Sequence, residues 1–181
     1  LAINKIMSDT PPDLMLSGIN RGVNIGEDMT YSGTIAAAME ATLCGVPAIA
    51  LSQEVASEGA NLSTNWTISK TYTAEIVQKA LSVYWPRDVL INVNFPSILN
   101  DNKNSIQITR EGRRKVGDEI IERKDPRGEP YFWIGAQQYS GNYPSGTDLA
   151  AIRNGIISVT PLSLNLTYQT IMQPLKEAFK V

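Results

Sequence analysis

The sequence predicts an α/β fold with a mostly parallel central sheet, and the region from residue 13 to residue 51 predicts it best. The apolar run at 13–17, which follows Pro11-Pro12, is typical of a buried parallel strand. A second apolar run at 48–51 follows a segment whose apolar residues recur at helical spacing. Strand, Gly-rich loop, helix and strand together make a right-handed βαβ crossover, and such sheets bind ligands at the carboxyl ends of their strands.

The other elements follow from the same patterns. The first helix opens at Ser32 to Thr34 and stops at Gly45, and residues 1–7 resemble the last turns of a preceding helix. We further predict an amphipathic helix at 71–84, strands at 89–94, 105–109 and 156–160, a short helix from Thr147 or Asp148 to 154, and a closing helix at 170–181. The strand at 105–109 is expected near an edge of the sheet. The polar connection at 52–70 is either a lid or a solvated loop.

Residues 110–135 have a different composition. Seven basic and five acidic residues between 110 and 127 make a mixed surface rather than a nucleic-acid patch. Together with apolar residues at 120–121 and 131–134, this stretch predicts an extended hairpin with an aromatic stripe, which needs a surface to pack on. The alternative, in which residues 131–134 form an ordinary core strand, remains open.

Composition limits the class of protein. The 181 residues are 43% hydrophobic, which is enough for one well-packed domain. A net charge of −2 gives no overall field that would attract nucleic acid or an anionic membrane. No apolar run reaches the length of a membrane span, and the single cysteine, Cys44, is expected to be a small core residue in a reducing compartment. We therefore expect a cytoplasmic protein.

The loop between the first strand and the first helix has the features of a ligand site. Glycines at 18, 22, 26 and 33 allow tight turns, and Ser32 and Thr34 begin a helix, where N–H groups and the helix dipole favour phosphate. Asn20 and Asp28 offer the hard oxygen ligands that suit Mg²⁺, Mn²⁺ or Ca²⁺.

Simpler interpretations are possible for each of these residues. Ser32 or Thr34 can be a helix cap, Asn20 a turn residue and Asp28 a surface carboxylate. The loop is neither a Walker loop nor a dinucleotide-binding fingerprint. The pattern alone therefore indicates a phosphate or metal site in an α/β protein.

Residues 17–40, SGINRGVNIGEDMTYSGTIAAAME, resemble the signature of the SurE family of survival proteins, which are metal-dependent phosphatases acting on nucleoside monophosphates. Similar blocks follow in the family's order at 45–50, 91–96, 108–110, 125–128, 133–135, 146–151 and 158–162. The resemblance implies a Rossmann-like, three-layer α/β/α fold with its core at 1–109. It also implies an extended β-hairpin arm at 110–135 that forms a homodimer or homotetramer, and a return to the core with a C-terminal helix at 136–181.

The resemblance also implies roles for individual residues. Asn20 would bind a divalent metal, Mg²⁺ or Mn²⁺, and phosphate would be held by Gly18, Ser32, Gly33 and Thr34. Asp28 and Ser32 are the catalytic candidates, with Asp28 in proton transfer or in the shell around the metal. The implied activity is the hydrolysis of nucleoside 5′-monophosphates to nucleoside and phosphate. No nucleic acid or membrane partner is expected.

Two features of the family are missing from the sequence. SurE proteins begin with a strand that ends in Asn-Asp-Asp-Gly, whose aspartates bind the metal, and a serine ligand follows on a later loop. We therefore expect a fragment or part of a longer protein rather than a degenerate copy. The sequence also has no histidine, although many members carry histidines after the 158–162 block, where Ser163 and Gln169 stand here.

These gaps leave three hypotheses. The first is an intact SurE-type 5′-nucleotidase of which this sequence lacks the N-terminus, and without a histidine it would use water or another acid or turn over slowly. The second is a non-catalytic or weakly active nucleotide- or phosphate-binding oligomer. The third is a structural remnant, for which only the arm argues.

Overall fold

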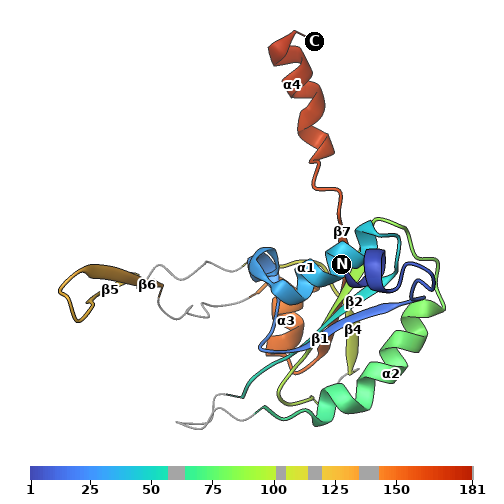
Figure 1. Cartoon of the computed structure of the whole chain (residues 1–181), viewed down its shortest axis with the longest axis horizontal. Coiled ribbons are helices and arrows are strands. Elements are labelled where there is room, and N and C mark those ends of the chain that lie inside the picture. Colours follow the sequence, from blue (N-terminus) through green and yellow to red (C-terminus); the bar gives the residue numbers. More distant parts are fainter. Residues whose placement is uncertain (57–63, 101–104, 114–119, 135–142, 181) are drawn as a thin grey trace.

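The structure, a computed structural model, describes residues 1–56, 64–100, 105–113, 120–134 and 143–180. Its centre is a five-stranded sheet in the order β1-β2-β3-β7-β4, shown in Figure 1. The strands are β1 (Met15–Arg21), β2 (Ala48–Gln53), β3 (Val89–Phe95), β4 (Ile106–Ile108) and β7 (Ile157–Ser163). Strands β1, β2 and β3 are parallel neighbours, β7 is antiparallel to β3, and β4 lies parallel to β7. The predicted mostly parallel sheet, with 105–109 at an edge, is confirmed.

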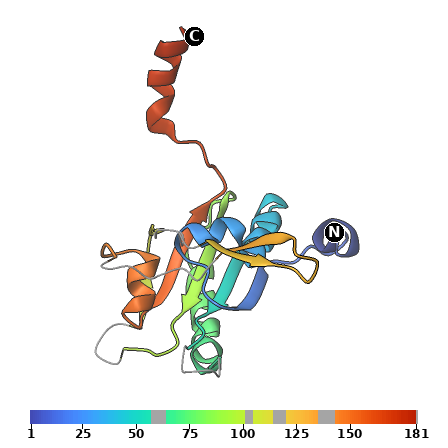
Figure 2. The ribbon, with the colours of Figure 1, turned by 90° about the vertical axis from the view of Figure 1, so that its left-hand side faces the viewer.

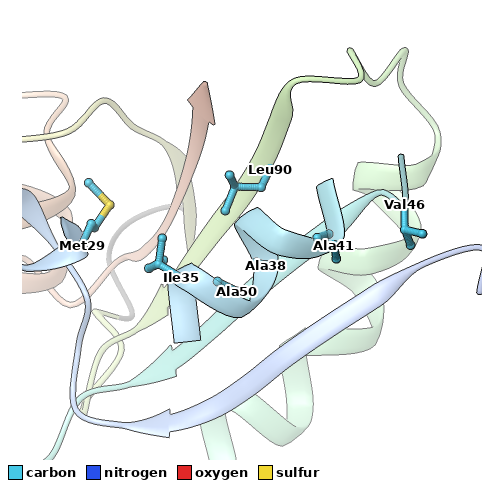
Figure 3. Packing of buried hydrophobic residues seen from close by; sticks show 8 residues of the cluster. Met29, Ile35, Ala38, Ala41, Val46, Ala50 and Leu90 are labelled. Carbon is cyan, nitrogen blue, oxygen red and sulfur yellow. The ribbon is translucent and has the colours of Figure 1, made fainter. Parts of the chain in front are cut away.

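Helices cover both faces of the sheet. Helix α1 (Gly33–Leu43) packs on Ala48 and Ala50, and α2 (Thr67–Leu81) packs on Ile49 and Leu51. Successive side chains of a strand point to opposite faces, so β2 is buried on both sides, as expected for a central parallel strand. Figure 3 shows the α1 side of this core, where Ile35, Ala38 and Ala41 meet Leu90. The short helix α3 (Asp148–Arg153) packs against β7 and β3.

The first strand is longer than the sequence predicts. It continues past Ser17 to Arg21, so Gly18 and Asn20 lie on β1 rather than in the loop. Beyond a break in register after Ser17, Asn20 pairs with Ser52 of β2. Pairing with β2, which a local pattern does not contain, overrides the turn preference of Gly18.

Other boundaries and environments also differ. Helix α2 begins at Thr67, four positions before the predicted start, and residues 2–6 form a short π-helix (Ala2–Ile6). Cys44 is exposed, and the prediction of a core cysteine is wrong because Ala41 and Thr42 take the buried positions of the last turn of α1. Part of the predicted polar connection at 52–70, from 57 to 63, lies outside the described residues.

Two segments stand away from the central sheet in Figure 1, and Figure 2 shows the second of them from another side. The first is an antiparallel hairpin of β5 (Ile120–Lys124) and β6 (Pro130–Ile134). Phe132 and Trp133 on β6 are 66% and 64% exposed, so β6 is not a core strand of this chain. The second is α4 (Met172–Phe179), which follows the 3₁₀ turn Gln169–Ile171 and has no buried residue. Within the described residues, the structure contains no helix with the length and apolar character needed to span a bilayer.

Gly18 is required by the close approach of β1 and β2. Its φ of +129° lies in the region that side chains avoid, and a Cβ atom there would lie 2.4 Å from the carbonyl oxygen of Leu51. We predict that Gly18→Ala lowers the free energy of unfolding by about 2–4 kcal/mol, because it adds backbone strain and a clash with a backbone atom.

Urea unfolding measures this effect, with Gly33→Ala as the matched control. Gly33 is the first residue of α1, and a Cβ atom added to it would meet no heavy atom of another described segment within 4 Å. The control should unfold near the parent midpoint. Equal urea midpoints for the parent, Gly18→Ala and Gly33→Ala would show that Gly18 of β1 does not lie so close to Leu51 of β2.

Candidate functional site

Asn24 fixes the Gly-rich loop across the carboxyl ends of β2 and β3. Its backbone N–H donates to Asn94 Oδ1 at 2.7 Å, and its side-chain amide donates to Ser52 Oγ at 2.8 Å. Its carbonyl oxygen accepts from the amide groups of Asn92 at 2.8 Å and Asn94 at 3.0 Å. All four residues are buried, and each unpaired group in such a network would cost about 1–3 kcal/mol. The loop therefore has one well-defined position over the sheet.

Asp148 is a second anchor for the same loop. This fully buried carboxylate accepts the N–H of Gly26 on one oxygen and those of Gly112 and Leu149 on the other, each at 2.8 Å. Thr147, rather than Asp148, caps α3 by accepting the N–H of Ala150 at 3.2 Å. Asp148 is thus left to join the Gly-rich loop to the segment that leads toward the hairpin. Charge-assisted hydrogen bonds of this kind are among the strong ones.

Asn20 presents an oxygen near the end of β1. Its side-chain Nδ2 donates to the carbonyl oxygen of Gly22 at 2.9 Å. This bond assigns the orientation of the amide and turns Oδ1 to the opposite side, where it can accept a hydrogen bond or bind a hard cation. The structure therefore gives Asn20 a turn contact and, at the same time, a suitable oxygen ligand.

The start of α1 is open to an anion. Ser32 caps the helix, because its Oγ accepts the N–H of Ile35 at 3.2 Å, and its own O–H can still donate. Gly33 and Thr34 are in the first turn, where backbone N–H groups have no acceptor within the helix. The space beside the Cα atom of Gly33 is free of other described segments to a distance of 4 Å, so a phosphate has access to these donors.

The two groups of candidate residues lie toward the same end of the sheet. In Figure 3, Met29 and Ile35 lie toward the carboxyl ends of β1 and β2, and the start of α1 lies beside them. The 3₁₀ helix Gly26–Tyr31 connects the anchored loop to Ser32 and carries Asp28, which is half-buried. The roles assigned to Asp28 and Gly18 stay predictions, and the close approach of Leu51 already accounts for a glycine at position 18.

Carboxylates surround the base of the loop. Burial raises the pKa of Glu111, the negative charges of Asp148 and Glu27 raise it further, and Arg113 lowers it. In the part of the chain that the structure describes, no three His, Cys, Asp or Glu side chains gather in a metal-binding cluster. The metal-binding role of Asn20 stays a prediction.

Sequence reasoning missed the anchoring roles of Asn92, Asn94 and Asp148. The sequence does contain a sign of the roles of Asn92 and Asn94. These two polar residues alternate with apolar ones in a strand that is otherwise typical of a buried core. Their partner Asn24 lies about seventy positions away in the chain, and no local pattern indicates that contact.

The fold and site define an α/β protein with an open helix start and an amide oxygen at the carboxyl edge of its sheet. A family model described as survival protein SurE matches residues 1–118. The 5′-nucleotidase SurE of Paramagnetospirillum magneticum is 49% identical over 179 residues, which are 99% of this chain and 68% of that protein. The 5′-nucleotidase SurE of Rhodospirillum rubrum is 48% identical over the same shares.

The structural comparison agrees with these relatives. The crystal structure of the SurE protein from Aquifex aeolicus has a TM-score of 0.80 and 37% identity, and the match covers 99% of this chain and 70% of that one. The chain therefore belongs to the SurE family, as the signature at 17–40 predicted. It spans about two thirds of the length of these relatives.

The raised pKa of Glu111 predicts a pH-dependent stability difference. Folding disfavours the charged form of this carboxyl, so its contribution is fully present below the ordinary pKa of 4.5 and is lost as the pH rises through the higher folded value. Glu111→Gln should therefore unfold at higher urea than the parent at pH 7. The difference should vanish below that ordinary pKa, where Glu111 is protonated in both states.

Urea midpoints at the two pH values measure this difference, and Glu40→Gln on the exposed side of α1 is the control. A variant that is no more stable than the parent at pH 7 would contradict the assigned electrostatics.

Proposed function

We propose that this chain acts as a 5′-nucleotidase, a metal-dependent phosphomonoesterase that hydrolyses nucleoside 5′-monophosphates to nucleoside and phosphate. The relatives named 5′-nucleotidase SurE align with nearly its whole length, which supports this activity. The observation that carries the proposal is the open start of α1 at the same end of the sheet as the Asn20 oxygen.

The start of α1 supplies the phosphate donors. The Ser32 hydroxyl and the backbone N–H groups of Gly33 and Thr34 would supply three hydrogen-bond donors, and the helix dipole adds favourable potential. These donors neutralise the charge that develops on the phosphate oxygens in the transition state. Gly18, on β1, is the fourth phosphate candidate.

The metal is the second part of the proposal. SurE proteins are metal-dependent in general, and Oδ1 of Asn20 fits Mg²⁺ or Mn²⁺ as one ligand. The family resemblance assigns further ligands to an aspartate pair and a serine that this sequence does not contain. A bound divalent cation polarises a phosphate and lowers the pKa of an attacking water.

Proton transfer is the third part. The chain has no histidine, so the proton for the leaving alkoxide must come from another acid or from water. Asp28 is the candidate within the chain, because it precedes the phosphate donors on the 3₁₀ helix that leads to Ser32. Asp28 can alternatively hold a water in the shell around the metal.

We also propose a homodimer or homotetramer that is built through the hairpin arm and acts in the cytoplasm. The exposed aromatic side chains of β6 need a surface to cover them, which supports the assembly. The net charge of −2 argues against a nucleic acid partner.

A second candidate is a nucleotide- or phosphate-binding protein without turnover. The lack of any histidine favours it. The same helix start would then bind phosphate, and metal binding would not be followed by phosphate release.

Replacing Asn20 tests the nucleotidase and its metal ligand. We expect phosphate release from nucleoside monophosphates in Mn²⁺ or Mg²⁺, its loss in EDTA, and a drop of at least about tenfold in Asn20→Ala, since one cation ligand is gone. The assay uses the natural full-length protein and measures inorganic phosphate. Asn154→Ala, which removes an amide bound to its own helix at Ala150, is the control.

Two results would decide against the nucleotidase. Phosphate release that survives EDTA and the Asn20 change would remove the metal from the mechanism. Metal binding without release, by folded protein, would favour the second candidate.

Charges on the hairpin should break the assembly. The double variant Phe132→Asp and Trp133→Asp places carboxylates on both faces of β6, and burying them at an interface would be costly. We expect a lower molar mass by light scattering, while Tyr84→Asp at a site 89% exposed leaves it unchanged. A parent protein that is already monomeric, or a variant with the parent mass, would refute the arm's role.

A further inference from the structure

A cavity of about 440 Å³ lies beside the Gly-rich loop. Its lining includes Ile25 of the loop, Glu54 after β2, Ser97 after β3, and Tyr143, Leu149 and Arg153 in and before α3. These positions place it at the same edge of the sheet as the candidate site. Its volume lies within the range of about 300–1,000 Å³ that is usual for small-molecule sites.

The cavity has an apolar floor and an aromatic wall. Ile25, Leu149 and Ile152 form a small buried cluster, and Tyr143 packs against it. The guanidinium of Arg153 lies over the Tyr143 ring at 6.0 Å from its centre. A flat heteroaromatic ring suits such a surface, because its faces pack on aliphatic and aromatic groups.

The polar groups of the cavity are held in place. One oxygen of Glu54 accepts the backbone N–H of Ser97 at 2.8 Å, and the carboxylate keeps acceptor capacity for hydroxyl groups. The hydroxyl of Tyr143 is buried and has no hydrogen-bond partner among the residues that the structure describes. The hydroxyl is therefore closed off from the cavity, and the ring of Tyr143 is the part that a ligand can contact.

From this lining we infer that the cavity binds the nucleoside half of the substrate, an inference that rests on the proposed function. The base packs on the apolar floor beside Tyr143, and the ribose hydroxyls donate to Glu54. The carboxylate of Glu54 would repel a phosphate, which fits a division between this cavity and the start of α1. The 3₁₀ helix between Ile25 and Ser32 has six residues and spans roughly 12 Å, so one nucleotide can reach both.

Two substrates separate binding of the nucleoside from the chemistry. We expect Tyr143→Leu, which removes the aromatic wall, and Glu54→Gln, which replaces one acceptor oxygen with an NH₂ donor, to raise KM for the preferred nucleoside monophosphate by about tenfold. Activity on p-nitrophenyl phosphate, which has no ribose or base, should stay unchanged. The matched controls are Glu75→Gln on α2 and Tyr84→Leu after its end, both at exposed positions, and they should behave like the parent on both substrates.

Equilibrium dialysis of adenosine, guanosine, cytidine and uridine adds a test that needs no turnover. The parent should bind at least one of them, and both cavity variants should weaken that binding by about tenfold. Variants that leave nucleoside binding and KM unchanged, or that impair both substrates equally, overturn the inference. If the parent hydrolyses neither substrate, the proposed function fails. The dialysis result then decides the inference. If the parent binds none of the four nucleosides, the inference is overturned.

Discussion

The hydrogen bonds between Asn24 and the strands β2 and β3 are the constraint on which the site depends. A loop with several glycines has high conformational entropy in the unfolded chain, and its local sequence does not favour a single backbone conformation. The carbonyl oxygen of Asn24 takes two amide donors and its N–H has a buried acceptor, so moving the loop would leave several buried groups unpaired. The 3₁₀ helix and the start of α1 follow directly in the chain, so the anchored loop also fixes where they lie over the sheet.

The face of the sheet that carries α1 is apolar under the helix and polar under the Gly-rich loop. On the α2 face, Val93 and Phe95 of β3 and Val159 of β7 form an apolar core. The alternate residues of the same strands are polar, with Asn94 opposite Ser158 and Asn92 opposite Thr160. Thr109 donates to or accepts from both of these hydroxyl groups at 2.7 Å. Hydrophobic burial under both helices stabilises the fold, and the hydrogen-bonded part of the α1 face beneath the loop holds the site in one geometry.

Local sequence patterns were sufficient to locate the helices and strands but not to predict the contacts between distant segments. Apolar runs and helical spacing located the strands, α1 and α3, because those features depend on neighbouring residues. The end of β1 depends on β2, which pairs Asn20 with Ser52, and no residue near Gly18 indicates that. Ser32 and Asn20 stood out through their residue types and the family signature. Asp148 did not, because its partners Gly26 and Gly112 come from distant segments.

The position of β1 at the edge of the sheet has a thermodynamic consequence for cation binding. Asn20 lies on this edge strand, so a further parallel strand that paired with its outer side would bring its own carboxyl end beside Asn20. A cation held by groups on both strands would bind the paired state more tightly than β1 alone. Strand addition and metal affinity would then be linked, and each would strengthen the other by the same free energy.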